Sequence, residues 1–297
     1  MSERSTIVSV DLDDLACYHA IHGLAPPDPA HAGVVLERCL PRFLELFDEL
    51  GVRATFFVIG RDLQRDLAAG GRGAALLRQA LAAGHELGNH SFSHAYDLVR
   101  WAPAAVYADL RACDVLLRGL GARPTGFRAP GYTHDAMLLQ QVAALGYRYD
   151  SSLLPSPVYY AAKLAMIGWM AMRGEPSRAH ARGWQSFLGP TRPHFMADCG
   201  LWEVPVSVSP VLRLPMVGTF VLGKRGALLR REAEARRYLH LELHGIDLAD
   251  VEVDGYDGAL RRRQPELRGS LAERLARLKG LLTARGGASS IGGAFAS

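Results

Sequence analysis

Short apolar runs alternate with amphipathic segments along most of the chain. The apolar runs end at glycines or charged residues, as buried strands do, and they lie at 6–10, 54–60, 85–89, 125–131, 147–153, 201–208 and 238–245. Between them, apolar residues recur with helical spacing and predict helices at 34–50, 74–84, 104–121, 135–146 and 270–285. Strands that alternate with helices indicate a mainly parallel sheet covered by helices. The pattern therefore predicts an α/β fold, either a barrel or a doubly wound sheet.

Three parts of the chain depart from this alternation. Pro41 lies inside the segment 34–50, and because proline lacks an N–H, we expect the helix to bend or divide there. Residues 153–200 are rich in Pro, Gly, Trp and Met, which predicts an irregular insert of a length that usually carries function. The tail 286–297 is predicted to be disordered. We expect residues 1–285 to form a single domain.

The insert contains an apolar segment, residues 158–174 (VYYAAKLAMIGWMAMRG), with nine uncharged residues between Lys163 and Arg173. It is too short to span a bilayer, which takes about 20 residues. Two interpretations stay open. The segment is either a buried helix or core-covering loop, or a Met- and Trp-rich flap that receives an apolar part of a substrate or rests on a bilayer surface.

Composition and charge narrow the class of protein. A chain of 297 residues with 49% hydrophobic content can bury a sizeable core in one large domain. The net charge is +4, but its 34 basic and 30 acidic residues are interspersed, so we predict no nucleic-acid partner. None of the four cysteines forms a C-x-x-C pair, which argues against a zinc knuckle or a disulfide framework.

The cellular location is expected to be the cytoplasm. Reduced thiols fit that compartment. The first residues, MSERSTIVSVDLDD, enter a strand without a basic and then apolar leader, so we expect no signal peptide.

Acidic residues follow the first predicted strand, at the kind of strand end where α/β folds place their sites. Asp11 and Asp13 point the same way on an extended chain, so one could bind a cation while the other acts as a base. The alternative is a helix N-cap and a solvated turn, to which Asp14 also belongs.

Histidines crowd the segment 84–94 (GHELGNHSFSH). His90 and His94 are four residues apart, a spacing that places both imidazoles on one face of a helical turn, where they could bind one ion. Two imidazoles and a carboxylate would leave open positions for water, as catalytic zinc and iron sites require. A polar turn that happens to be rich in histidine is the alternative.

Two later strand ends carry further candidates. In GFRAPGY (126–132), Arg128 could lock a carboxylate in its ionised form, and the N–H of Gly131 could hold an oxyanion, unless this is only a surface turn. In LHLELHGID, alternation places His240, Glu242 and His244 on one face of a strand. His244 lies at the strand end and is the candidate general acid, and we expect His240 to be structural.

Together these motifs resemble the polysaccharide deacetylase (NodB-like) superfamily, over roughly residues 5–250. The order is the same: paired aspartates, an H-S-x-x-H motif, an R-x-P turn, an aspartate-bearing strand and a late histidine, here Asp11/Asp13, His90/His94, Arg128-Ala129-Pro130-Gly131, Asp150 and His244. The segment GVRATFFVIG also looks like the second strand of that family. The resemblance implies a distorted (β/α) barrel of about seven mainly parallel strands and a metal-dependent amide hydrolase.

The resemblance also implies a role for each residue. Asp13, His90 and His94 would bind a divalent metal, with Asp14 as the alternative to Asp13. Zinc is the preferred metal, with cobalt, nickel, iron and manganese as alternatives. Asp11 would be the base, held by Arg128, and the Gly131 N–H would help to hold the oxyanion. His244 would protonate the leaving amine, with Asp150 as a support for Arg128 or His244.

The departures from the family pattern shape the expected function. The first motif, DLDD, lacks a following glycine and is similar to a D-x-D branch that includes intracellular deacetylases and cyclic-amide hydrolases. Asp150 is followed by SSLLP and not by Asp-Trp, which argues against a long polysaccharide. We expect removal of an N-acyl group, acetyl first, from an amino sugar or sugar-like substrate.

Alternatives remain for the substrate and the activity. A lipid-linked amino-sugar phosphate, deacetylated or deformylated with peripheral contact at the inner membrane face, is one. A cyclic amide is another. A non-catalytic sugar-binding protein is disfavoured, since no motif residue is missing.

Overall fold

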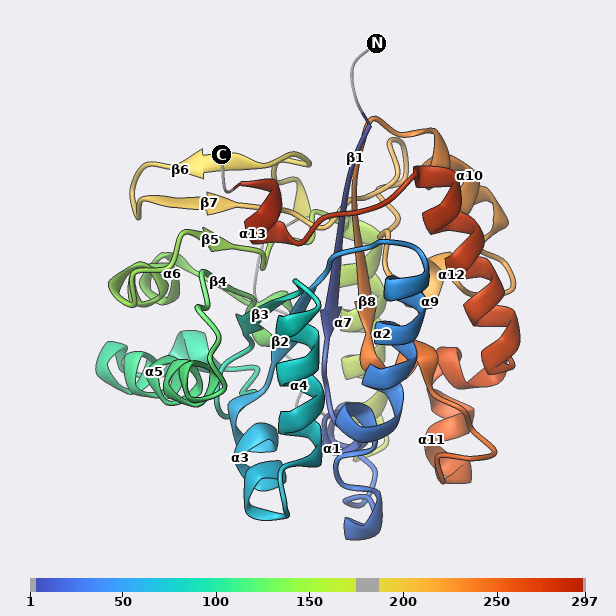
Figure 1. Cartoon of the computed structure of the whole chain (residues 1–297), viewed down its shortest axis with the longest axis horizontal. Coiled ribbons are helices and arrows are strands. Elements are labelled where there is room, and N and C mark those ends of the chain that lie inside the picture. The colour runs from blue at the N-terminus through green and yellow to red at the C-terminus, as the bar shows by residue number, and fades with distance from the viewer. Residues whose placement is uncertain (1–3, 175–186, 296–297) are drawn as a thin grey trace. The chain divides into compact units, whose positions relative to one another are not determined.

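The computed structural model describes residues 4–174 and 187–295, which form an α/β structure of strands and helices (Figure 1). The chain divides into two compact units, each assembled from segments that are distant in sequence. The first unit comprises residues 1–56, 66–86 and 216–297, and the second comprises residues 57–65 and 87–215. The expectation of a single domain over residues 1–285 stays a prediction.

The first unit is built on two long parallel strands that come from opposite ends of the sequence. β1 (Ser5–Asp11) pairs along its whole length with β8 (Tyr238–His244), and the two lie side by side in Figure 1. The register places Asp11 opposite His244. Both strands were predicted from their apolar runs. Their pairing brings the first and the last polar motifs of the sequence to the same level.

Three helices of the first unit correspond to predicted ones, namely α2 (Leu40–Glu49), α4 (Arg72–Ala82) and α12 (Leu271–Arg285). Four more were not predicted: α1 (Leu15–Ile21), α9 (Gly218–Val221), α10 (Ala227–Ala235) and α11 (Gly258–Arg263). A π-helical turn, η2 (Val35–Cys39), precedes α2, and Pro41 stands in the first turn of α2. The predicted division of the segment 34–50 is therefore confirmed. Proline is tolerated there because an N–H in the first turn has no partner within the helix.

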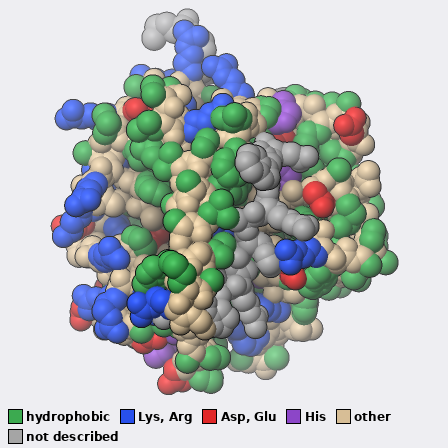
Figure 2. Space-filling model, turned by 180° about the vertical axis from the view of Figure 1, so that it is seen from behind, with side chains coloured by type: hydrophobic (Ala, Val, Ile, Leu, Met, Phe, Trp, Pro, Cys, Tyr) green, Lys and Arg blue, Asp and Glu red, His purple; other side chains and the backbone are tan. Residues whose placement is uncertain are grey.

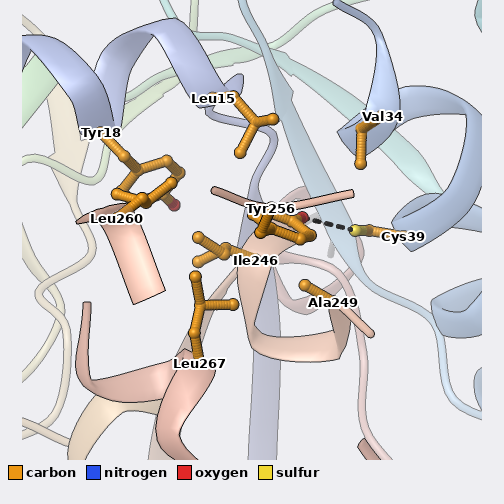
Figure 3. Packing of buried hydrophobic residues seen from close by; sticks show 9 residues of the cluster. All are labelled: Leu15, Tyr18, Val34, Cys39, Ile246, Ala249, Tyr256, Leu260 and Leu267. Carbon is orange, nitrogen blue, oxygen red and sulfur yellow. Dashed lines mark hydrogen bonds between the residues drawn. The ribbon is translucent and has the colours of Figure 1, made fainter. Parts of the chain in front are cut away.

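A buried cluster holds the segments that follow β1 and β8 (Figure 3). Leu15 from the start of α1 packs in it with Ile246, which follows the end of β8. Within the cluster the thiol of Cys39 lies 3.6 Å from the hydroxyl of Tyr256. Burial raises the pKa of Cys39 to about 12, so this thiol stays neutral. The cluster fixes both strand ends, and with them the polar residues that they carry.

The tail of the chain is ordered where the structure describes it. Ser289 pairs with β1, and α13 (Ile291–Ala294) buries Ile291 completely. The N–H of Ile291 donates to Thr55 Oγ1 and the N–H of Gly292 to Glu86 Oε2, at 2.8 Å each. The prediction of disorder over 286–297 is wrong for this part. Its glycine permits a close approach, since a Cβ on Gly292 would lie 2.5 Å from the Glu86 carboxylate.

The second unit contains a row of short strands. Parallel neighbours follow in the order β3 (Glu86–Asn89), β4 (Gly126–Phe127), β5 (Tyr149–Asp150) and β7 (Leu201–Glu203), and β6 (His194–Met196) pairs antiparallel with β7. Helices α5 (Pro103–Gly119) and α6 (Ala136–Ala144) lie side by side in Figure 1 and share a buried cluster with Phe127 and Leu201. Residues of β2 (Thr55–Val58) and α3 (Gly60–Ala68) are divided between the units.

The expected irregular insert begins with a regular helix, α7 (Pro157–Met172). Ser156 accepts a hydrogen bond from the N–H of Tyr159 as its N-cap, and Pro157 fits the first helical position. The prediction of irregular structure is therefore wrong for these residues, whereas residues 175–186 lie outside the described part. The helix buries Tyr160, Lys163 and Met170. It matches neither interpretation fully, because its other sides expose apolar residues.

Surface features agree with the mild net charge. Figure 2 shows Lys and Arg side chains distributed among hydrophobic and acidic side chains on the visible face. Among the helices of residues 4–174 and 187–295, none is both long enough and apolar enough to cross a membrane. All four cysteines are free thiols.

Candidate active site

The first unit brings two predicted catalytic residues together at the ends of β1 and β8. Asp11 and His244 are partners in the strand register, and ligand atoms of Asp11, Glu242 and His244 all lie within 4.8 Å of one another. Asp11 and Glu242 are buried, whereas the His244 side chain keeps 21% of its surface exposed. A candidate base and a candidate acid thus share one polar cluster. Glu242 joins them, although the sequence only placed it on the same face.

The protonation of His244 follows from its acidic neighbours. Burial lowers the pKa of His244. The carboxylates of Glu242, Asp11 and Asp13 raise it by more than burial lowers it, so the pKa is about 9. The nearest of these contacts joins His244 Nε2 to Glu242 Oε1 at 3.7 Å. His244 therefore carries a proton near neutral pH, which is the state that a general acid needs.

Other polar residues of the same strands have structural roles. Asp14 caps α1 by accepting a hydrogen bond from the N–H of Leu15 at 2.8 Å, so the capping alternative holds for Asp14. This leaves Asp13, which is buried just after β1, as the stronger candidate ligand. His240 Nε2 lies 3.0 Å from the Ser9 hydroxyl inside the core, as expected of a structural histidine.

In the second unit, His90 and His94 meet without a helical turn. Ser91 has φ of 62° and His94 has φ of 50°, so the chain turns through the left-handed region and the predicted helical geometry is wrong. The rings nevertheless lie close together, edge to face, with centroids 4.8 Å apart. Both side chains are buried, which excludes the alternative of a solvated polar turn.

Buried polar groups hold this unusual turn in place. Asn89 Oδ1 accepts from the N–H of Ser91, and the Ser91 hydroxyl accepts from the N–H of His94. The Asp109 carboxylate accepts from the next two N–H groups, those of Phe92 and Ser93, at 2.9 and 3.0 Å. Side chains that satisfy so many backbone donors offset the strain of two left-handed residues.

The hydrogen bonding of His90 suits a metal ligand. His90 Nδ1 lies 2.8 Å from the carbonyl oxygen of Arg128. A carbonyl only accepts, so Nδ1 carries the proton and Nε2 keeps its lone pair. Histidines that bind metals show this pattern, in which the second nitrogen donates to a carbonyl or carboxylate. The paired, buried imidazoles therefore fit a divalent cation.

Arg128 is fully buried, which excludes the alternative of a solvated surface turn. Its Nε donates to the carbonyl of Ser151 at 2.9 Å and one terminal nitrogen donates to the Ser151 hydroxyl at 2.8 Å. Its guanidinium carbon lies 4.4 Å from the centroid of the Phe57 ring. These contacts fix a permanent positive charge at the end of β4.

Asp150 supports the Arg128 turn indirectly. Its carboxylate accepts from the N–H and the hydroxyl of Ser152, and the Ser152 hydroxyl accepts from the N–H of Ala129. Burial, and next the charge of Asp150, raise the pKa of Glu203 well above its usual range, so Glu203 stays protonated beside Asp150. The serines that make these bonds carried no signal in the sequence.

Gly131 takes a conformation and a place that only glycine fits. Its φ is 60°, and a Cβ there would lie 2.6 Å from Cδ1 of Tyr96. Its carbonyl accepts from Lys163 Nζ at 3.0 Å. Within the described residues its N–H has no hydrogen-bond partner, and its role as an oxyanion donor stays a prediction. The sequence indicated no role for Tyr96. It indicated Lys163 only as a basic flank of the apolar segment, suited to anionic headgroups at a bilayer surface.

Comparisons with known proteins agree with the motifs. The family profile described as polysaccharide deacetylase matches residues 31–149. The chain is 26% identical over 147 residues to the peptidoglycan deacetylase of Helicobacter pylori, covering 49% of this chain and 48% of that protein. It is 36% identical over 118 residues to the peptidoglycan-N-acetylglucosamine deacetylase of Bacillus cereus, covering 37% and 45%. The chain thus spans about half the length of the curated relatives that it matches.

A solved structure supports the fold over the whole chain. It comes from Mycobacterium smegmatis, is assigned to the polysaccharide deacetylases, and aligns with a TM-score of 0.58 at 19% identity, covering 97% of this chain and 87% of that one. This likeness confirms the predicted α/β fold, a distorted (β/α) barrel. The described residues form eight strands where about seven were expected, and the additional antiparallel strand β6 accounts for the difference.

Proposed function

Because part of the chain matches the polysaccharide deacetylase family and the whole chain has the fold of a structure assigned to it, we propose that it is a hydrolase that removes an N-acetyl group from an amino sugar or a sugar-like substrate. One observation carries this proposal. The pairing of β1 with β8 sets Asp11 beside a protonated His244, so a base and an acid lie at adjacent strand ends. Amide hydrolysis needs both, one to take a proton from water and one to give a proton to the amine.

A divalent metal belongs to the same proposal. Asp13, His90 and His94 would hold it, with zinc preferred and cobalt, nickel, iron and manganese as alternatives. When bound, such an ion lowers the pKa of water and polarises the amide carbonyl. The bond from His90 Nδ1 to a backbone carbonyl supports this ligand set, because it leaves Nε2 for coordination.

The residues of the chain then divide the proton transfers. Asp11 accepts the proton of the attacking water, and Arg128 keeps the role that the resemblance implies, to hold that carboxylate ionised. The N–H of Gly131 binds the oxyanion that forms on the carbonyl. His244 donates its proton to the departing amine, which leaves as a neutral group.

The test is an amine-release assay combined with metal analysis. Purified protein is assayed on N-acetylated chitooligosaccharides and peptidoglycan fragments, and its metal content is measured by mass spectrometry. Asp11→Asn should keep the metal and lose about 10²-fold or more in rate, whereas His90→Ala should lose the metal as well. Asp14→Ser, which preserves the helix cap, is the matched control and should stay active. Full activity in Asp11→Asn would refute the proposed base.

A second candidate substrate is a lipid-linked amino-sugar phosphate. The observation in its favour is the outer surface of α7, where Leu164, Trp169 and Met172 are 50%, 48% and 81% exposed. Such a surface could receive an acyl chain or contact the inner membrane face. Replacing Trp169 by Ser should lower the rate on the lipid-linked substrate but not on a soluble one. Equal rates on both would exclude this candidate. A cytoplasmic location and a cyclic-amide substrate remain predictions from the sequence.

A further inference from the structure

Lys163 is a buried lysine that the proposed reaction does not use. It lies on α7 within an apolar stretch, and only 8% of its surface is exposed. Burial lowers its pKa to about 8, so the ammonium still predominates at neutral pH. A charge placed in such poorly solvating surroundings is unfavourable unless something compensates it.

The described contacts of Lys163 compensate only part of that charge. Its Nζ donates one hydrogen bond, to the carbonyl of Gly131, and lies 5.8 Å from the centroid of the Tyr159 ring. No carboxylate of residues 4–174 and 187–295 forms an ion pair with it. An ammonium has three donors and the carbonyl takes one. The group is therefore poised to bind an anion.

The position of Lys163 connects it to the paired imidazoles. A Cβ on Gly131 would lie 3.3 Å from Lys163 Nζ and 2.6 Å from the Tyr96 ring. That ring in turn lies 5.1 Å, between centroids, from the ring of His94. One glycine and one tyrosine thus separate the ammonium from the candidate metal ligands, all within the second unit. A substrate that reaches the imidazoles would come close to Lys163.

A purely structural role explains the position less well. Anchoring the Gly131 carbonyl needs only one neutral donor, which a glutamine or a serine supplies without a buried charge. Tyr132 and Tyr159, whose rings meet edge to face at 5.5 Å, already link this turn to α7. A purely structural role therefore does not explain why this side chain is charged.

We propose, on the basis of the function proposed above, that Lys163 selects substrates in which the acylated amino sugar carries an anionic group, a carboxylate or a phosphate. The ammonium would bind that group while the amide lies at the imidazole pair. Lys163 is then a specificity-determining residue and takes no part in the proton transfers.

The experiment compares three N-acetylated sugars that differ in charge: neutral N-acetylglucosamine oligomers, a muramic acid derivative with a carboxylate, and N-acetylglucosamine phosphate. The variants are Lys163→Met, which keeps the length and removes the charge, and Lys163→Arg, which keeps the charge. In Lys163→Met, kcat/KM on the preferred anionic sugar should fall about 10- to 100-fold, mainly through KM, because a bond to a charged group is lost. The neutral sugar should change less than about threefold, and Lys163→Arg should retain most of the preference.

The outcomes separate this inference from the proposed function. A wild-type enzyme that prefers the neutral sugar, or a Lys163→Met variant that loses equally on all three, would overturn the inference and leave the deacetylase activity standing. If wild type releases no amine from any sugar, the proposed function fails, and binding of the same sugars by calorimetry decides the inference alone. Anion-dependent binding that Lys163→Met abolishes supports it, and equal binding of charged and neutral sugars rejects it. Melting temperatures of all variants verify the fold.

Discussion

Two cationic side chains with little exposed surface have pKa values shifted in opposite directions. His244, at the end of β8, has four acidic side chains around it, those of Glu242, Asp11, Asp13 and Asp247, and its pKa rises to about 9. Lys163, on α7, has no carboxylate partner in the part of the chain that the structure describes, and its pKa falls to about 8. Burial disfavours the charged form in both cases. The neighbouring side chains therefore decide the direction of each pKa shift. Carboxylates compensate the charge of His244, the proposed general acid, whereas the charge of Lys163 stays available for the anion proposed above.

Removing the imidazole of His244 should have the largest effect on activity. His244→Ala is expected to lower kcat by about 10²-fold or more, because a positioned general acid is lost, while metal content and melting temperature stay near those of wild type. His194→Ala on β6 is the control, since the one hydrogen bond of this imidazole within the described residues is to the Arg192 carbonyl of its own segment. If His244→Ala keeps its rate, the leaving amine is protonated by another group.

Neutralising the carboxylate of Glu242 should lower the pKa of His244 without removing the proposed general acid. Glu242→Gln takes away the largest contribution that raises the pKa of His244, so that pKa should fall from about 9 towards its ordinary value of 6.5. Because a general acid must be protonated, activity is lost as pH rises through this pKa. The alkaline limb of kcat/KM should therefore move down by about 1–2 pH units. A limb that stays in place would assign it to another residue.

The uncompensated charge of Lys163 should affect the free energy of unfolding. The pKa of Lys163 in the folded protein, about 8, lies below its ordinary 10.5, so the folded state binds fewer protons between these values. Wild-type stability should accordingly rise through this window as the buried charge is lost. At pH 7 the charge destabilises by on the order of 3 kcal/mol, and the bond to Gly131 returns about 1 kcal/mol.

Lys163→Met should therefore unfold with a free energy higher by on the order of 2 kcal/mol at pH 7, and this gain should disappear near pH 10.5. Denaturant unfolding at several pH values measures it. Lys279→Met is the matched control, because this lysine is exposed and pairs with Glu49 at the surface. Its replacement should change stability by less than about 1 kcal/mol at any pH. A Lys163→Met variant that is less stable at pH 7 would show that the ammonium is well solvated.

The surroundings of His244 could be predicted from the sequence better than those of Lys163. Asp11 and His244 each follow an apolar run, so their places at strand ends were visible locally. Alternation also placed Glu242 on the face of His244, although its electrostatic effect depends on the register with β1, which joins residues more than 200 positions apart. Strand ends were thus predictable, and the charges that meet there were not.

Lys163 escaped prediction for a physical reason. A lysine in an apolar segment can extend its amine to solvent or bury it, and only the packing of α7 against the Gly131 turn decides which. The same holds for the turn at His90 and His94. Its left-handed residues depend on Asn89 and Ser91 within the turn and also on Asp109, fifteen positions further along the chain from His94. Composition was a poor guide at the tail, where glycines permit close contact and do not indicate disorder.

The tail has a consequence for how the protein is made. β1 leaves the ribosome more than 200 residues before its partners β8 and Ser289. A strand with an unpaired edge invites association with other chains while synthesis continues. The edge of β1 that β8 covers therefore stays open until β8 has been synthesised. Biogenesis, more than final stability, is then the stage at which changes near residues 289–294 should be felt.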